Sequence, residues 1–239
     1  MRLLEVTITW LRVALARWTG PGRPPVVAGP APLGAGRRVV VAGLVQPDRT
    51  SCGSACLVVA RMLGDPSYAR WLATGEAGGS RRDVRAPERR FADEALAAHA
   101  RTSHWADADG HLQVPWPRRY GTAPWSLARE LSLIGGTTPP GTRHRVRTIS
   151  PRRRGEAFDE VAVSVGTGHA VPLFVGNRLL PRHVVLVVGA SADRLTAYDP
   201  ATGRRVVLPR DAFVTGTLRV SGWSEPWFAV LPEPPQADG

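Results

Sequence analysis

The spacing of apolar residues changes from a helical to a strand-like pattern near residue 170, and this change constrains the fold more than any other feature. Before that point, apolar side chains recur every three or four residues, as in amphipathic helices. After it, short β-favouring segments are separated by Gly, Asn, Asp and Pro. We therefore expect an α+β fold, with N-terminal helices packed on a C-terminal antiparallel β-sheet.

The two patterns also place the individual elements. The helical spacing predicts helices over 52–63, 91–100, 125–134 and 158–165. The β-favouring segments predict strands at 171–175, 183–188, 194–198, 205–208 and 227–231, together with an earlier short strand at 39–45. Between the first two helices, residues 74–90 are polar and rich in Gly and Arg, which is typical of a surface loop. Residues 102–120 show no period and are expected to be irregular.

A stretch dense in Pro and Gly, residues 20–36, divides the chain. Such a composition cannot continue a helix and indicates a linker. Residues 1–19, before it, carry apolar side chains at helical spacing and predict an amphipathic helix, which either docks on its own domain or contacts a membrane surface or a partner. Residues 37–232 then form one domain, and residues 233–239 are expected to be a flexible tail.

The chain is strongly basic, and its charge favours acidic partners. All 31 basic residues are arginine, and against 20 acidic residues they give a formal net charge of +11. Nucleic acid, anionic lipid or an acidic protein surface would suit that charge, although a general bias toward arginine explains it equally well. The dense stretches are Arg81, Arg82, Arg85, Arg89 and Arg90, then Arg143, Arg145, Arg147, Arg152, Arg153 and Arg154. They are not interleaved with aromatic residues, so no specific nucleic-acid site is predicted.

Cys52 and Cys56 are the only cysteines, and Cys52 is the first candidate for chemistry. Two cysteines exclude a multi-bridge secreted scaffold and a four-cysteine zinc site. Cys52 stands where a helix begins, where unpaired backbone N–H groups and the helix dipole stabilise a thiolate, the nucleophilic form. Gly53 follows it and would permit a close approach of substrate. The alternative is a buried structural cysteine at a helix start.

A nucleophilic cysteine needs a base and a group that orients the base. His183 heads the apolar strand HVVLVVG, and Asp199 closes the next strand in LTAYDPATG. Two neighbouring antiparallel strands would bring the carboxylate beside the imidazole. Each residue also has an ordinary structural interpretation, His183 as a satisfied strand-end histidine and Asp199 as a turn former.

In this combination the sequence resembles the papain-like cysteine peptidases related to the bacteriocin-leader-processing peptidases, including their stand-alone members. Gln46 lies six residues before Cys52, and Asp199 sixteen residues after His183, and both spacings are similar to the family pattern. The segments GTAPWSLARELSLIGG and GHAVPLFVGN look like family elements too. The resemblance covers roughly residues 39–215. It implies a papain-like fold and a thiol-dependent peptidase or amidase.

The resemblance also implies roles for individual residues. Cys52 would be the nucleophile, His183 the general base and then acid, and Asp199 the group that orients the imidazole. The Gln46 amide and the Cys52 backbone N–H would donate to the oxyanion. Ser51 and Ser54 depart from the family, in which Asp before and Pro after the Cys-Gly are frequent.

Several further expectations complete the sequence interpretation. The substrate would be a peptide or amide, with hydrolysis or acyl transfer as the outcome and no cofactor or metal. A metal site from His99, His104, His111, Asp107 and Asp109 lacks a recognised ligand spacing.

Cys56 would be a core residue or a resolving thiol. The alternative function is a non-catalytic basic binding module on the same scaffold. No apolar run reaches the ~18 residues of a membrane span, and we expect a cytoplasmic protein, with residues 1–19 as the candidate for peripheral membrane contact.

Overall fold

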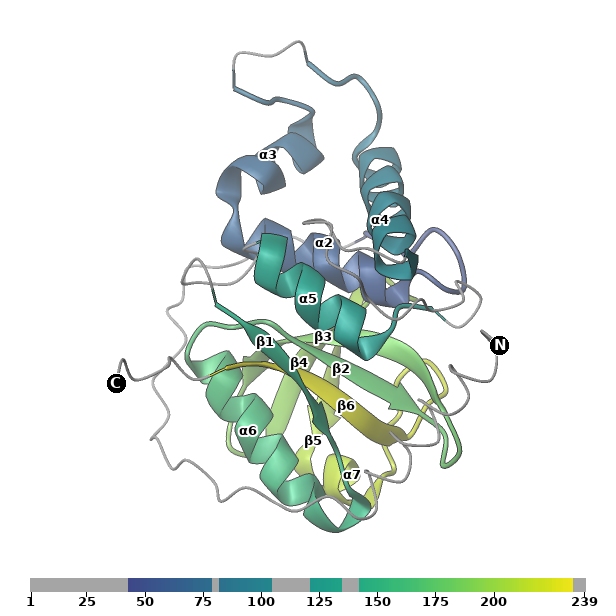
Figure 1. Cartoon of the computed structure of the whole chain (residues 1–239), viewed down its shortest axis with the longest axis vertical. Coiled ribbons are helices and arrows are strands. Elements are labelled where there is room, and N and C mark those ends of the chain that lie inside the picture. The colour runs from purple at the N-terminus through teal and green to yellow at the C-terminus, as the bar shows by residue number, and fades with distance from the viewer. Residues whose placement is uncertain (1–42, 79–81, 105–120, 135–141, 234–239) are drawn as a thin grey trace.

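The structure, a computed structural model, describes residues 43–78, 82–104, 121–134 and 142–233 (Figure 1). Helices dominate its first part and strands its second, so the expected α+β class is confirmed. The predicted N-terminal helix over 1–19 and the linker over 20–36 lie outside the described residues, as does all but the first residue of the predicted tail.

The described elements follow the sequence prediction closely. The helices are α2 (Cys52–Gly64), α3 (Pro66–Thr74), α4 (Pro87–Ser103), α5 (Pro124–Ile134), α6 (Arg154–Gly166) and α7 (Arg210–Thr215), with a 3-10 turn η2 (Pro151–Arg153) before α6. The strands are β1 (His144–Thr148), β2 (Val171–Gly176), β3 (Pro181–Ala190), β4 (Arg194–Asp199), β5 (Arg204–Pro209) and β6 (Glu225–Pro232). Of these elements, α3, α7 and β1 are not predicted by the sequence patterns.

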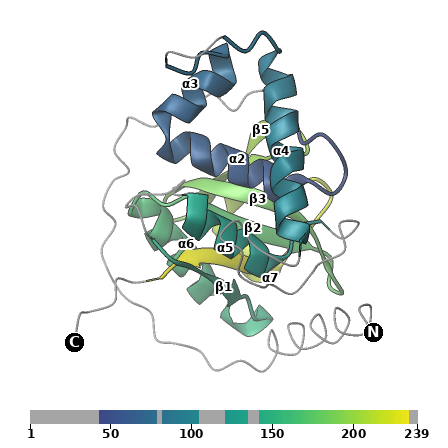
Figure 2. The ribbon, with the colours of Figure 1, turned by 45° about the horizontal axis from the view of Figure 1, so that its top comes forward.

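In the described part of the chain, six strands form one sheet in the order β1-β6-β2-β3-β4-β5, and all neighbours are antiparallel. The helices cover both faces of this sheet. Figures 1 and 2 show α2, α4 and α5 on one side and α6 and α7 on the other. The expected arrangement, helices packed on the sheet, is therefore present, with a second helical layer that the sequence interpretation did not include.

Strand β3 shows why both faces must be covered. Val184 and Leu186 belong to the apolar cluster under α2, whereas Val185 and Val187 belong to the cluster under α6. Successive side chains of a strand point to opposite faces, so an unbroken apolar run requires two apolar layers. The run HVVLVVG is thus the sequence signature of a sheet buried on both sides.

Helix α2 lies at the centre of the first layer, against β3, α4 and α5. Ten of its thirteen residues are buried, and a helix that is apolar on all sides must be enclosed by other elements. Its predicted start at Cys52 is confirmed, and it ends at Gly64, one residue after the predicted end. Within the described ranges, no helix combines the length and the apolar character that crossing a bilayer requires.

Three differences from the sequence prediction have physical causes. Helix α3, which the sequence analysis did not predict, begins at Pro66 directly after α2, and Asp65 accepts hydrogen bonds from its first N–H groups. Strand β1 is an edge strand paired only with β6. Its sequence, His-Arg-Val-Arg-Thr, contains one apolar residue and therefore gives no recognisable strand pattern. Of the strand expected over 39–45, residues 43–45 are described and form none. Instead Gly43 donates to the Gly203 carbonyl beside the β4–β5 turn, at 3.3 Å.

Candidate active site

Cys52 is the first residue of α2. The first hydrogen bond of the helix runs from the Ala55 N–H to the Ser51 carbonyl, at 2.8 Å. The backbone N–H groups of Cys52, Gly53 and Ser54 precede that bond and have no acceptor within the helix. The sulfur therefore lies at the positive end of the helix dipole, as the sequence predicts for a stabilised thiolate.

Gly53 has a packing role, and the substrate-approach role that we expected stays a prediction. A Cβ atom on Gly53 would lie 2.7 Å from Thr122 Cβ, inside van der Waals contact. Beside it, Ser54 Oγ lies 3.1 Å from Thr122 Oγ1, so the first turn of α2 is joined to the segment that leads into α5. Gly53 is thus required because two segments approach closely, and this contact fixes the helix end that carries Cys52.

His183 and Asp199 come together from adjacent strands. The β3–β4 pairing aligns Leu186 with Tyr198, which places the end of β4 toward His183. His183 Nε2 lies 2.7 Å from Asp199 Oδ1, and both side chains are buried. The juxtaposition that we inferred from the order of strands is therefore present in the structure.

The surroundings of His183 favour its protonated form. Burial by itself lowers the pKa of His183, but hydrogen bonds to Asp199 and Cys52, together with their negative charges, outweigh burial and raise it from 6.5 to about 9. Burial raises the pKa of Asp199, and hydrogen bonds from His183 and Ser221 reverse that effect and lower it. At neutral pH the pair is an imidazolium and a carboxylate.

Gln46 lies on the segment that leads into Cys52, and this segment is hydrogen-bonded to the turn that follows Asp199. Its backbone N–H donates to the Pro200 carbonyl at 2.8 Å, directly after Asp199. Its side-chain Nε2 donates to the Asp48 carbonyl at 2.6 Å, and Oε1 is buried with no hydrogen-bond partner among the described residues. The loop thus brings Gln46 to the site, while its role as oxyanion donor stays a prediction.

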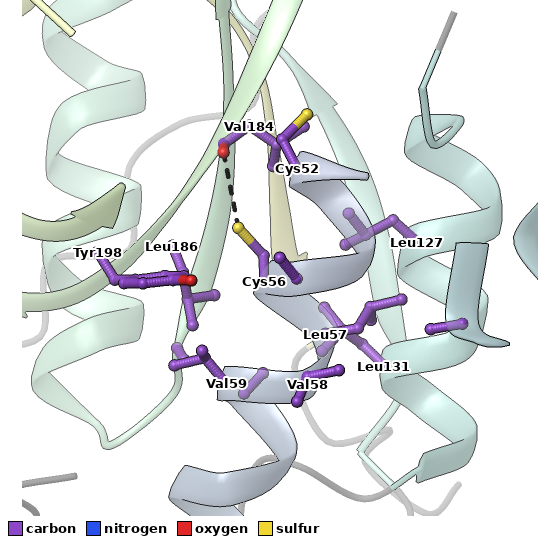
Figure 3. Packing of buried hydrophobic residues seen from close by; sticks show 14 of the residues in the cluster. Cys52, Cys56, Leu57, Val58, Val59, Leu127, Leu131, Val184, Leu186 and Tyr198 are labelled. Carbon is purple, nitrogen blue, oxygen red and sulfur yellow. Dashed lines mark hydrogen bonds between the residues drawn. The ribbon is translucent and has the colours of Figure 1, made fainter. Parts of the chain in front are cut away.

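Cys56 lies one helical turn after Cys52, in the core. Figure 3 shows the Cys56 sulfur directed at the Val184 carbonyl, with the Cys52 sulfur pointing elsewhere. The Cys56 Sγ to Val184 O distance is 3.6 Å. Burial, followed by the negative charges of Cys52 and Asp199, raises the pKa of the Cys56 thiol well above its ordinary value. Cys56 packs as a core residue, and both cysteines are free thiols in the structure.

Ser221 belongs to the site, and the sequence interpretation missed it. Its hydroxyl donates to Asp199 Oδ2 at 2.6 Å, while the Ala201 N–H donates to Asp199 Oδ1 at 3.0 Å. The dipeptide Ser221-Gly222 signals a turn in the sequence. No sequence pattern, however, places that turn beside Asp199.

Two of the five candidate metal ligands, His99 and His104, lie among the described residues. Among the described residues no group of three or more His, Cys, Asp or Glu side chains could hold a metal ion. His99 is buried on α4, where its Nε2 lies 3.5 Å from Thr50 Oγ1. Of the other candidates only His104 is described, since residues 105–120 lie outside the described ranges.

The arginine clusters form many contacts within the fold. Arg90 is buried and donates to the Leu72 carbonyl at 2.9 Å. Salt bridges join Arg85 to Asp83 and Asp93, Arg89 to Asp93, Arg147 to Glu160, Arg153 to Glu156, and Arg154 to Glu225. Several of the clustered arginines therefore pair within the fold, and the basic binding module stays an untested alternative.

Comparison of the sequence with models of known protein families finds no match, and comparison with curated proteins finds none either. The functional argument therefore depends on the residues of the site and their geometry.

Proposed function

We propose that this protein is a cysteine hydrolase of peptide or amide bonds, with Cys52 as nucleophile, His183 as general base and acid, and Asp199 as the residue that orients His183. The observation that carries the proposal is the buried 2.7 Å contact between His183 Nε2 and Asp199 Oδ1 beside a cysteine at a helix start. A nucleophile, a base and an orienting carboxylate form the general arrangement for covalent acyl transfer.

The first half of the reaction forms a thioester. The Cys52 thiolate attacks the substrate carbonyl carbon, and the carbonyl π electrons move to oxygen. The Cys52 N–H and the Gln46 amide would donate to that oxyanion. The C–N bond then breaks, and His183 gives the departing nitrogen the proton of the ring nitrogen that does not face Asp199.

The second half of the reaction releases the acyl group. Water attacks the thioester while His183 takes its proton, and the C–S bond breaks to restore the Cys52 thiolate. An amine in place of water would give a transamidation through the same steps. Asp199 stays ionised throughout and holds the imidazole in one orientation.

Alkylation with iodoacetamide at neutral pH, followed by mapping of the adduct, tests the proposal. Cys52 and Cys56 share one helix and differ in their contacts, so each serves as the control for the other. We expect the adduct on Cys52, and a much slower reaction in His183→Ala because the thiolate loses its imidazolium partner. Undiminished labelling in His183→Ala, or labelling confined to Cys56, would contradict the triad.

The location of the protein is part of the same proposal. We infer a cytoplasmic protein whose N-terminal residues 1–19 contact either its own domain or a membrane surface. Pelleting with anionic vesicles, compared between the full chain and a variant that lacks residues 1–36, tests the membrane contact. Equal pelleting of the two proteins would assign any binding to the remainder of the chain.

A further inference from the structure

We propose that Ser221 is a positioning residue that holds the Asp199 carboxylate in the orientation needed by His183, an inference that rests on the proposed function. Ser221 Oγ donates to Asp199 Oδ2 at 2.6 Å, while Oδ1 faces His183 Nε2 at 2.7 Å. Oδ1 also accepts from the Ala201 N–H at 3.0 Å, and Ser221 is the residue that holds the other oxygen, Oδ2, among the described contacts. A carboxylate fixed at both oxygens cannot turn about its terminal torsion, which is otherwise broad.

The backbone at Ser221 indicates that the hydroxyl is required there. Ser221 has φ of 46° and is the one non-glycine residue with positive φ in the described part of the chain, and Gly222 follows with φ of 85°. Val220 and Trp223 close this two-residue turn by hydrogen bonds of 3.1 and 2.8 Å. Positive φ at both central positions defines a type I′ turn, which favours Asn, Asp or Gly at the first of them. A serine there accepts backbone strain and contributes a hydroxyl to Asp199.

The turn is also attached to the sheet that carries the triad. The Ser224 N–H donates to the Gly176 carbonyl at the end of β2, at 3.0 Å, and the Leu218 N–H donates to the Ser224 carbonyl at 3.1 Å. Strand β2 is the direct neighbour of β3, which carries His183. The hydroxyl therefore reaches Asp199 from a support that is fixed relative to His183.

A pair of substitutions separates the hydroxyl from the strain. Ser221→Gly removes both, so the relief of strain at positive φ offsets the stability lost with the hydrogen bond, while kcat/KM falls about tenfold. Ser221→Thr keeps the hydroxyl and adds a β-branched side chain at positive φ, so it lowers the Tm and retains more activity than Ser221→Gly. Activity and stability are thus expected to rank these two variants in opposite orders. A purely structural role for Ser221 would rank both properties alike.

A second measurement follows the site without turnover. NMR titration of labelled histidine in the full chain should show the pKa of His183 below its wild-type value of about 9 in Ser221→Gly, because the carboxylate turns away from the ring, and unchanged in Ser221→Thr. Ser191→Ala is the matched control, because Ser191 also donates to an aspartate, Asp193 at 2.8 Å, in the distant β3–β4 turn. This control should leave both the titration and kcat/KM unchanged.

The outcomes distinguish the inference from the function on which it rests. A Ser221→Gly variant with wild-type kcat/KM and an unchanged His183 titration overturns the positioning role. A wild type that labels at Cys56 alone overturns the proposed hydrolase. If the wild type labels at Cys56 alone but the His183 titration still shifts in Ser221→Gly, then Ser221 does orient Asp199, and the site has a function other than hydrolysis.

Discussion

His183 and His144 are buried in the same sheet, yet their pKa values move in opposite directions. His144 begins the edge strand β1, where burial and then the charge of His169 lower its pKa from 6.5 to about 4, against a hydrogen bond with the Thr142 backbone that raises it. His183 experiences the same penalty of burial, but hydrogen bonds to Asp199 and Cys52 raise its pKa to about 9. Burial alone therefore yields a neutral histidine, and anionic partners convert the same burial into a protonated one.

The opposite pKa shifts of the two histidines indicate which of them can take part in catalysis. A neutral histidine such as His144, with its Nδ1 at 3.4 Å from Ser132 Oγ, is a packed polar residue. A protonated histidine between a carboxylate and a thiol is prepared to stabilise a thiolate and to donate a proton. Strongly perturbed pKa values alone do not separate the two histidines, because both are perturbed. The direction of the pKa shift, and the partners that cause it, distinguish His183 from His144.

The largest effect is expected when each histidine is replaced in turn. His183→Ala removes the base and the acid of the proposed reaction, so kcat should fall by roughly 10⁴–10⁶-fold, as for members of such triads. His144→Gln should leave kcat unchanged, since His144 belongs to another part of the sheet. Steady-state hydrolysis of a peptide or amide substrate measures both. Equal losses in the two variants would contradict the comparison.

A smaller effect is expected for Asp199→Asn, which preserves the shape of the side chain and removes its charge. The pKa of His183 should fall below its wild-type value of about 9, because burial then acts with less opposition. The rate should fall by roughly 10³–10⁴-fold, because the imidazole loses its stabilising carboxylate. Histidine NMR titration and kcat measure the two consequences. An unchanged titration would mean that Asp199 is not the source of the raised pKa.

The sequence was sufficient to predict the helices and strands in which apolar residues recur at a regular spacing. The helical spacing after Cys52 and the apolar run after His183 predicted α2 and β3, and the order of strands predicted that Asp199 would approach His183. These features are local, or they follow from the pairing of neighbouring antiparallel strands. They include the contact on which the proposed function depends.

The remaining features depend on contacts that no local pattern encodes. Strand β1 alternates Arg145 and Arg147 around one apolar residue, and only its pairing with β6 defines it as a strand. Ser221 lies 22 residues after Asp199, and its turn signal contains no information about the carboxylate that it meets. The packing contact of Gly53 with Thr122, far along the chain, could not be predicted from the sequence either.

The smallest expected effect is the opposite pH dependence that the two histidines give to stability. Folding holds His144 neutral down to about pH 4, whereas the unfolded chain protonates it near pH 6.5. The unfolded state therefore binds more protons in this interval, and the unfolding free energy should fall by about 3 kcal/mol as the pH decreases through it. His183 acts in the opposite sense: its stabilisation is complete below pH 6.5 and is lost as the pH rises through about 9.

Difference curves isolate these two contributions from the other titrating groups. Denaturant unfolding of the wild type and of His144→Gln, measured from pH 4 to pH 9, should diverge only at the acidic end, where the wild type loses more stability. The wild type and Asp199→Asn should instead differ most below pH 6.5 and converge toward pH 9 and above, because the His183–Asp199 ion pair no longer exists once His183 is neutral. Divergence of both variants at the same end of the pH range would mean that the two histidines share one environment, which would contradict the contact of Asp199 with His183.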